Sequence, residues 1–284
     1  MTLVQAQGLS KRFGDVQALD GFDLTVEPGQ IVGLIGPNGS GKTTALKAIL
    51  GLSRLDGGTI QAFGLDPFKH RPDLMRRTAY IADTGILPRW MRIRDLLAFV
   101  ASVNPAFDRN RAEAALANTE IRPGKKVGTL SKGMTVQLHL AIVLAVNAEL
   151  LVLDEPTLGL DILYRQRFYD ALLNDYFAEQ RAILVTTHEV REIEHILTQV
   201  VFIDRGRTRL HLGTDELAAS FAKVVANAER SDALRAMNPL SERRSLRGRE
   251  FIFRDANAQA LAECGEVSTP SLPELFTAVM EERR

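Results

Sequence analysis

The sequence of 284 residues has little of several features that mark particular classes of protein. It contains one cysteine, Cys264, so no disulfide can form within the chain, which fits a reducing compartment. Lys and Arg together number 35, as do Asp and Glu, so the formal net charge is zero. This balance gives no general electrostatic attraction to nucleic acid, and no nucleic-acid partner is expected.

Long apolar runs are also missing. A membrane-spanning helix needs about 20 predominantly apolar residues. The most apolar stretch, residues 138–153, is interrupted by His139, Asn147 and Glu149. The N-terminus has neither the basic start nor the apolar run of a signal peptide, so none is expected. If the protein acts at a membrane, we expect it to do so through a partner.

A glycine-rich segment at residues 36–43 fits the phosphate-binding loop (P-loop) pattern, with two glycines five apart followed by Lys42 and Thr43. It lies between an apolar run, 31–35, and a helix-forming stretch, 44–50, which is the strand-loop-helix context that the motif needs. Lys42 is expected to reach the outer phosphates and Thr43 to give its hydroxyl to a magnesium ion. An ordinary glycine-rich turn is the alternative, and the presence of both Lys and Thr disfavours it. The candidate nucleotide-binding residues are Gly36, Pro37, Asn38, Gly39, Ser40, Gly41, Lys42, Thr43 and Thr44.

Two adjacent acids follow a second apolar run. Residues 150–153 read as a buried strand that ends in Asp154 and Glu155, where parallel sheets bind their ligands. Asp154 suits a magnesium-holding role, and Glu155 suits the base that polarises an attacking water. A helix start is the alternative, and the P-loop upstream favours catalysis. His188 follows another strand-like run, so we expect it to reach the terminal phosphate from a neighbouring strand end.

The order of patterns predicts an α/β fold. Residues 1–30 read as antiparallel strands and turns, and the P-loop then opens a parallel core. A helical pattern from about 85 to 149 predicts an inserted helical subdomain. Strand-like runs return at 150–153, 183–186 and 200–203, which completes a mixed, mostly parallel sheet.

The last part of the chain, residues 215–284, is predicted to be a small accessory or regulatory extension, because it has too little apolar material for a confident independent domain. We expect a helix-like run at 216–226, a strand at 250–253 and a final helix at 272–282. The basic residues of this region are interpreted as a solvated turn rather than a binding patch. They are Arg243, Arg244, Arg247 and Arg249.

A third motif, Leu130-Ser131-Lys132-Gly133-Met134, completes a resemblance to the ATP-binding cassette (ABC) ATPases over about residues 1–214. The P-loop is similar to their Walker A motif and residues 151–155 to Walker B. Residues 158–161 resemble the D-loop, and His188 stands at the switch histidine. Residues 130–134 stand where the family has its signature, Leu-Ser-Gly-Gly-Gln.

The resemblance implies ATP and Mg²⁺ as ligands, with Lys42, Glu155 and His188 as catalytic residues. In the family two cassettes sandwich two ATP molecules, so Ser131 and Gly133 of one subunit are implied to face the phosphate bound by the other. The second cassette is then most simply an identical chain. Three further positions acquire roles from the resemblance alone. They are Phe13 (stacking on adenine), Asp161 (nucleotide contact in the D-loop) and Asp83 (magnesium, where the family usually has Gln).

The resemblance further implies the ATPase subunit of a transporter whose transmembrane permease subunits are separate chains, with the cassette at the cytoplasmic face of the membrane. The signature variant and the segment 270–276 are similar to cassettes of export systems, so export is expected. The stretch 85–91, with Trp90 and Met91, is a candidate permease contact. Two alternatives stay open: a soluble ABC ATPase of translation or DNA maintenance, and an ATP-binding switch that barely hydrolyses.

Overall fold

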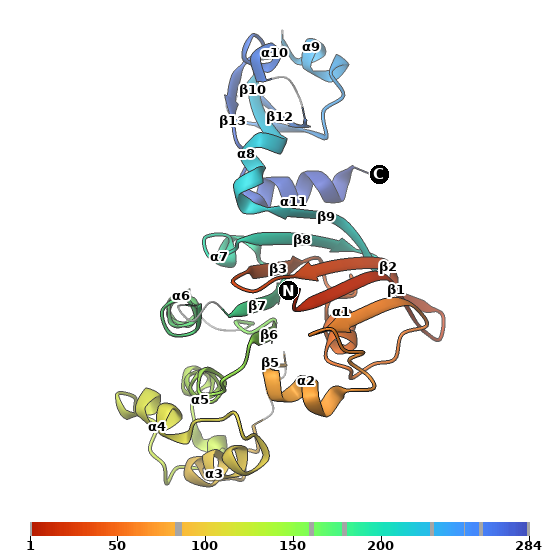
Figure 1. The fold of residues 1–284 in the computed structure, drawn as a ribbon. Helices are drawn as coiled ribbons and strands as arrows, with labels where there is room; N and C mark the ends of the chain where they lie inside the picture. Colours follow the sequence, from red (N-terminus) through yellow and green to blue (C-terminus); the bar gives the residue numbers. More distant parts are fainter. Residues whose placement is uncertain are drawn as a thin grey trace.

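The computed structural model describes residues 2–82, 87–158, 162–177, 181–227, 230–246, 248–255 and 258–282. Its main sheet has six strands in the order β5-β6-β7-β3-β8-β9 (Figure 1). The strands are β5 (Thr78–Ile81), β6 (Leu150–Asp154), β7 (Ala182–Thr187), β3 (Ile31–Ile35), β8 (Gln199–Asp204) and β9 (Arg207–Gly213). All neighbours pair in parallel except β9, which is antiparallel to β8. The prediction of a mixed, mostly parallel sheet is confirmed.

A second sheet is antiparallel, as the sequence predicted for the N-terminal residues. It contains β2 (Val16–Val26), β1 (Val4–Phe13) and β4 (Gly57–Ala62), with β1 in the middle. In the first half of β1 buried and exposed residues alternate, which is the period of a strand with one face on a core. Apolar side chains of this sheet share one buried cluster with α1 (Lys42–Ile49), the helix after the P-loop. The antiparallel sheet thereby holds one side of the P-loop helix.

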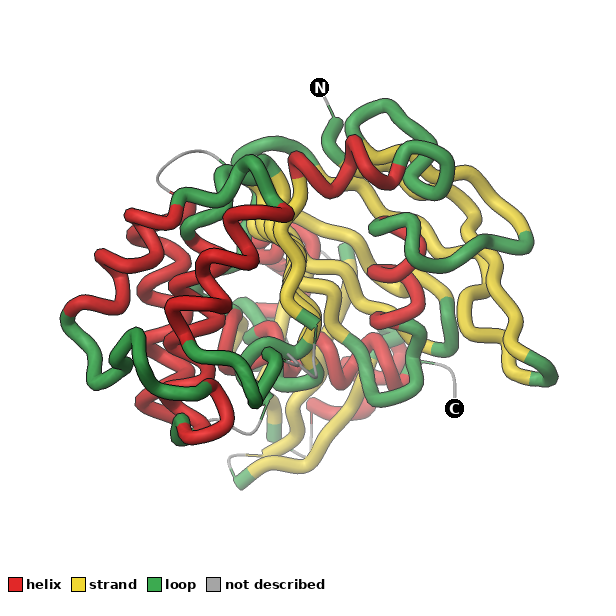
Figure 2. The backbone as a smooth tube through the Cα atoms, turned by 90° about the horizontal axis from the view of Figure 1, so that it is seen from below, coloured by secondary structure: helices red, strands yellow, loops and turns green. Residues whose placement is uncertain are grey.

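Helices dominate the chain between β4 and β6. They are α2 (Arg71–Arg77), α3 (Ile93–Val103), α4 (Arg109–Ala117), the 3₁₀ turn η1 (Val127–Thr129) and α5 (Lys132–Leu144). The side chain of Asp108 accepts a hydrogen bond from the Arg111 amide, which caps the start of α4. Figure 1 places α3, α4 and α5 at one end of the molecule, beyond β5, and Figure 2 shows most helices gathered on one side of the strands.

Two helical segments separate the last strands of the parallel core. Helix α6 (Ile162–Ala171) runs into a π-helical turn, η2 (Leu172–Tyr176), before β7. Helix α7 (Val190–Ile193) is a single turn that follows β7 directly. In the described part of the chain, no helix is both long and apolar enough to cross a bilayer.

The C-terminal part contains a third sheet, in the order β11-β12-β10-β13. Its elements are η4 (Thr214–Glu216), α8 (Leu217–Ser220), β10 (Phe221–Ala226), α9 (Ser231–Ala236), β11 (Ser241–Ser245), β12 (Gly248–Arg254), α10 (Ala258–Ala262), β13 (Glu266–Ser268) and α11 (Leu272–Glu281). The expected helix at 216–226 was wrong, because only one turn forms before β10 pairs with β12 on one side and β13 on the other. The β-branched pair Val224 and Val225 suits that paired strand. The expected strand at 250–253 and the final helix are present.

The arginines of this region were wrongly interpreted as a turn. Arg243 and Arg244 lie on β11 and Arg249 on β12, while Arg247 lies outside the described residues. Arg243 pairs with Glu281 on α11 at 2.9 Å. Arg249 pairs with Glu242 on the adjacent strand. Acidic partners on neighbouring elements therefore hold two of these arginines.

Helix α11 returns to the main sheet after the third sheet is complete. The ring of Phe276 meets the ring of Phe202 on β8 edge to face, with centroids 5.2 Å apart. Leu272, Leu275 and Val279 are buried in the same apolar cluster as Ile31 on β3. The end of the chain therefore packs on the parallel core itself.

Candidate active site

The P-loop joins β3 to α1 with backbone geometry that only glycine allows at two positions. At Gly36 a Cβ atom would lie 2.3 Å from the carbonyl oxygen of Ile203. Gly41 has a φ of 110°, which other residues rarely adopt, and a Cβ there would lie 2.4 Å from the Ala18 carbonyl oxygen. The loop is thus held between β8 and β2, and its backbone packs directly against the backbone of these two strands.

Lys42, the first residue of α1, is only 6% exposed. Its Nζ donates to the carbonyl oxygens of Gly36 at 2.7 Å and Pro37 at 3.3 Å. The same ammonium lies 3.2 Å from Oε1 of Glu155, so the loop and the end of β6 share one cation. Oε1 has no hydrogen-bond partner among the described residues, and its contact with Lys42 is an ion pair without hydrogen-bond geometry.

Glu155 directly follows β6 and has a φ of 47°, a left-handed conformation that is uncommon for a residue with a side chain. Two hydrogen bonds to the neighbouring strand hold it, and a third holds the residue before it. The Glu155 amide donates to the carbonyl and hydroxyl oxygens of Thr186, at 3.2 and 3.0 Å. The Thr186 hydroxyl in turn donates to Oδ1 of Asp154 at 2.7 Å. Strain of this kind gathers at functional sites, where surrounding contacts enforce it.

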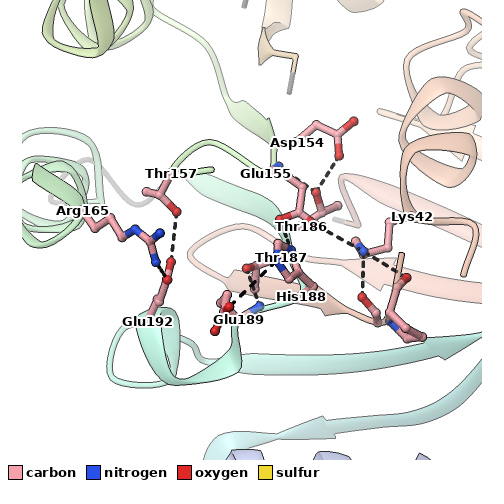
Figure 3. Close-up of polar contacts among 12 residues, drawn as sticks. Lys42, Asp154, Glu155, Thr157, Arg165, Thr186, Thr187, His188, Glu189 and Glu192 are labelled. Atoms are coloured by element: carbon pink, nitrogen blue, oxygen red, sulfur yellow. Dashed lines mark hydrogen bonds and ion pairs between the residues drawn. The ribbon is translucent and has the colours of Figure 1, made fainter. Parts of the chain in front are cut away.

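His188 lies at the end of β7 beside Glu155, with Nδ1 2.8 Å from Oε2 of the carboxylate (Figure 3). An ionised carboxylate can only accept a hydrogen bond, so Nδ1 is the donor in this contact. His188 is about one-third exposed and Glu155 about one-tenth. A semi-enclosed base and an imidazole thus stand side by side, opposite the Lys42 cation.

These groups surround a cavity of about 520 Å³. That volume is within the range of small-ligand sites, about 300–1,000 Å³. Its lining residues are Val16, Ala18, Asn38, Gly39, Ser40, Gly41, Lys42, Thr43, Thr44, Glu155, Leu158 and His188. Backbone N–H groups at a helix start and a lysine ammonium suit an anion, while the carboxylate and imidazole suit proton transfer. The arrangement can therefore bind a phosphate chain and activate a water beside it.

The signature segment lies elsewhere in the chain. Ser131 caps the N-terminus of α5, with its hydroxyl accepting from the Met134 amide at 3.2 Å. Gly133 faces Tyr164 so closely that a Cβ atom would lie 2.8 Å from the ring. Among the residues that the structure describes, none of residues 130–134 lines the P-loop cavity. One chain brings together the P-loop, Glu155 and His188, and leaves Ser131 and Gly133 apart from them.

Comparison with known proteins supports what the site geometry suggests. A family model described as ABC transporter matches residues 19–158. Nod factor export ATP-binding protein I of Burkholderia thailandensis is 35% identical over 215 residues, which cover 72% of this chain and 68% of that protein. The chain belongs to the ABC transporter family. Two further relatives and a solved structure agree with that membership.

ABC transporter ATP-binding protein YtrB of Bacillus subtilis is 30% identical over 222 residues, covering 78% of this chain and 76% of that protein. Aliphatic sulfonates import ATP-binding protein SsuB 1 of Nocardia farcinica is 36% identical over 209 residues, covering 72% and 79%. The solved structure of an ATP binding subunit of an ABC transporter superposes with a TM-score of 0.69 at 26% identity, covering 76% of this chain and 91% of that one. This ABC cassette is therefore an ATP-binding protein by family.

The remaining predicted site residues of the cassette are placed as follows. Thr43 is exposed at the cavity, and Asp154 is 1% exposed at the end of β6. Their hydroxyl and carboxylate oxygens are ligands that Mg²⁺ accepts, together with waters and substrate phosphates. Asp83 and Asp161 lie outside the described residues.

Phe13 is 52% exposed, and Lys11 Nζ lies 5.2 Å from its ring centroid. In the described part of the chain the cavity is lined on that side by Val16 and Ala18 of β2, and Phe13 does not line it. Stacking of Phe13 on adenine therefore stays a prediction.

The sequence alone did not indicate Thr186, although this residue holds both Asp154 at the end of β6 and Glu155 just after it. The only signal was a threonine pair, Thr186 and Thr187, closing an otherwise apolar strand. Such a hydroxyl acquires a role only when the neighbouring strand is known, because its partners lie 31 and 32 residues away.

Proposed function

We propose that this cassette binds ATP with Mg²⁺, hydrolyses it to ADP and phosphate, and so powers transport through separate permease subunits. The observation that carries the proposal is the convergence of Lys42, Glu155 and His188 on the P-loop cavity. Membership of a transporter family supports the transport role. The relatives compared above are transporter subunits by name, which favours transport over a soluble ATPase of translation or DNA maintenance.

In this mechanism the P-loop amides and Lys42 bind the β- and γ-phosphates. Lys42 exchanges the carbonyl oxygens of Gly36 and Pro37 for phosphate oxygens, and it moves away from Glu155 as it does so. Oε1 of Glu155 then accepts the proton of the attacking water, while His188 holds Oε2. Thr43, Asp154 and Asp83 are the proposed magnesium-binding residues, and a bound ion would neutralise charge on the transferred phosphoryl group.

We further propose that two copies close over the nucleotides. Ser131 and Gly133 lie away from the cavity of their own chain, so any contact with phosphate requires another chain. Three apolar side chains that follow Glu155 in the chain are also exposed, and the first of them lines the cavity. They are Leu158 (53%), Ile162 (80%) and Leu163 (69%). A second cassette on this face buries them and stabilises the closed form that ATP favours.

A largely apolar cavity of about 640 Å³ between the main sheet and the helical segment is the proposed seat of a permease. Met75 and Tyr80 line it from α2 and β5, and Val100, Val103 and Val146 line it from the helical side. Trp90, 73% exposed, belongs to the stretch 85–91 proposed as a permease contact, of which residues 87–91 are described. A permease bound at this surface would hold the cassette at the cytoplasmic face of the membrane. Export is the proposed direction, supported by similarity to the Nod factor export protein, although SsuB 1 is a relative named for import.

The proposal is tested by tagging the chain in its host, solubilising membranes in mild detergent and identifying the proteins that co-purify. A multi-helix membrane protein at comparable abundance is expected, and ribosomal or DNA-repair proteins in its place would overturn the transport role.

The proposed closure of two copies is tested separately, since Glu155→Gln with ATP and Mg²⁺ is expected to run as a dimer on a sizing column. Lys42→Ala is the control that stays monomeric, and a Glu155→Gln variant that also stays monomeric argues against the sandwich.

A further inference from the structure

Four polar side chains behind the active site form a cluster that the catalytic chemistry does not use. They are Thr157, Arg165, Tyr169 and Glu192. The Thr157 hydroxyl lies 3.1 Å from the Tyr169 hydroxyl and donates to Oε2 of Glu192 at 3.2 Å. Arg165 pairs with the other oxygen of that carboxylate. Thr157 is 4% exposed and Tyr169 is 1% exposed, so the cluster is largely shielded from water.

The hydrogen bonds of the cluster run in one direction. Burial, and to a smaller extent the charge of Glu155, raises the pKa of Tyr169 to about 12, so its hydroxyl stays protonated. A carboxylate can only accept a hydrogen bond, so the Thr157 hydroxyl donates its one hydrogen to Glu192 and accepts a hydrogen bond from Tyr169. Arg165 then balances the Glu192 charge. Removing the Thr157 hydroxyl leaves the buried Tyr169 hydroxyl without this partner, which costs more than the hydrogen bond itself.

The cluster joins the two segments that carry the catalytic pair. Thr157 lies within the turn that Glu155 begins, closed by a hydrogen bond from the Leu158 amide to the Glu155 carbonyl oxygen at 3.1 Å. Glu192 lies on α7, four residues after His188. The turn is therefore connected twice to the segment 188–192, by Glu155–His188 at the cavity and by Thr157–Glu192 to one side of it, as Figure 3 shows.

Helix α6 supplies the other two members and also contacts the signature helix. Arg165 and Tyr169 are four residues apart, so they lie on one face of α6 and reach the cluster together. Tyr164, on the same helix, packs its ring against Gly133 at the start of α5. Helix α6 therefore contacts both the start of the signature helix and the polar cluster.

We propose that Thr157 and Glu192 are positioning residues for Glu155 and His188. Through the Tyr164–Gly133 contact, α6 makes the positions of Thr157 and Glu192 depend on the position of the signature segment. This inference rests on the proposed ATP hydrolysis. The new element is a connection between the signature segment and the catalytic pair of the same chain. In the proposed sandwich that signature serves the partner's nucleotide, so α6 connects the two ATP sites.

The test measures ATP hydrolysis by the full-length chain co-purified with its membrane partner. Thr157→Val removes the hydroxyl at nearly constant volume, and Glu192→Gln removes the charge. Each is expected to lower kcat about tenfold, equivalent to about 1.4 kcal/mol of barrier. KM for ATP is expected to stay within about twofold, because neither residue lines the cavity and ground-state binding is kept. Thr157→Ser keeps the hydroxyl and is expected to restore kcat, and Glu194→Gln, two residues along, is the charge-matched control.

The link through α6 is tested by a double-mutant cycle. Tyr164→Ala removes the ring from Gly133, and its effect on kcat is measured alone and together with Thr157→Val. Coupling predicts that the second change has a smaller effect once the first is present. Additive effects would overturn the link through α6.

Thermal unfolding and ATP binding separate positioning from loss of fold. If Thr157→Val or Glu192→Gln keeps the wild-type kcat, or if KM rises while kcat is unchanged, the positioning role is wrong. A variant that unfolds is replaced by Tyr169→Phe, for which the same fall in kcat at constant KM is expected. Absence of hydrolysis in the wild type overturns the proposed function and the inference with it. Failure in the variants alone overturns only the inference.

Discussion

The imidazole of His188 contacts the carboxylate of Glu155 through Nδ1 and Oε2, 2.8 Å apart. The two residues come from the ends of adjacent parallel strands, β7 and β6, whose register pairs Asp154 with Thr186. The contact occupies Nδ1 of the imidazole and does not involve Nε2. It also fixes the orientation of Glu155, whose backbone is already held in the left-handed region.

Replacement of His188 is expected to lower the rate of ATP hydrolysis without lowering the affinity for ATP. We expect His188→Ala to lower kcat by about 100-fold or more, the usual range for loss of a positioned acid-base group, with little change in ATP affinity. The measurement is steady-state hydrolysis together with binding of a fluorescent ATP analogue. His195→Ala, at an exposed histidine on the same segment, serves as the control. Equal losses of affinity and turnover would mean that His188 supports the cavity rather than the reaction.

Lys42→Ala is expected to act on binding instead. Lys42 is the cation that the P-loop places at the cavity, and loss of a charge-assisted contact to phosphate costs about 2 kcal/mol or more, which is about 30-fold in affinity. Lys47→Ala, at an exposed lysine one turn further along α1, leaves the affinity unchanged. Binding is measured by isothermal titration with ATP and Mg²⁺, and wild-type affinity in Lys42→Ala would contradict the proposed role.

The close packing of the P-loop gives a prediction about stability. In Gly36→Ala the new methyl group meets the carbonyl oxygen of Ile203, so β8 or the loop has to shift. We expect a loss of about 1–3 kcal/mol in the free energy of unfolding, together with weaker ATP binding. Gly124→Ala is the matched control, because a Cβ atom there meets nothing within 4 Å. Urea unfolding of the two variants compares them directly, and equal stability would show that the loop adjusts freely.

The positions of Glu155 and His188 were predictable, because each of them follows a strand that its own apolar run marks. The strand 150–153 predicted the position of Glu155, and the strand before His188 did the same for the histidine. The cluster around Glu192 was not predictable, since Arg165 and Glu192 are brought together by the packing of α6 on α7, which no local pattern records. The prediction of a helix at 216–226 was wrong because the apolar residues of this run suit a helix and a strand equally. Pairing with β12 and β13 stabilises the strand.

Acid is expected to weaken the third sheet through Glu242. The hydrogen bond from Arg235, aided by Arg249, lowers the pKa of Glu242 to about 2 in the folded protein, from an ordinary 4.5. A carboxyl whose folded pKa is lowered stabilises the fold at pH values above the ordinary one and loses that contribution as the pH falls to the folded one. The difference in stability between wild type and Glu242→Gln is therefore expected to be constant from pH 8 to about 5, and to shrink between pH 4.5 and about 2. Thermal melts of both proteins across this range check it, and a difference that grows on acidification would contradict the ion-pair assignment.

The return of α11 to the main sheet predicts that residues 215–284 cannot be removed without loss. Phe276 packs on Phe202, and Leu275 is fully buried in the apolar cluster of the parallel core, so truncation after residue 214 uncovers apolar surface. We expect the truncated chain to aggregate or to unfold at a lower temperature. Phe276→Ala is the milder form of the same change, with an expected cost of about 2 kcal/mol for a partly buried ring. Leu246→Ala, at a fully exposed leucine just after β11, is the control and leaves the melting temperature unchanged. If the truncated protein melts as the full chain does, α11 contributes no stability to the core, and the extension behaves as an appended module.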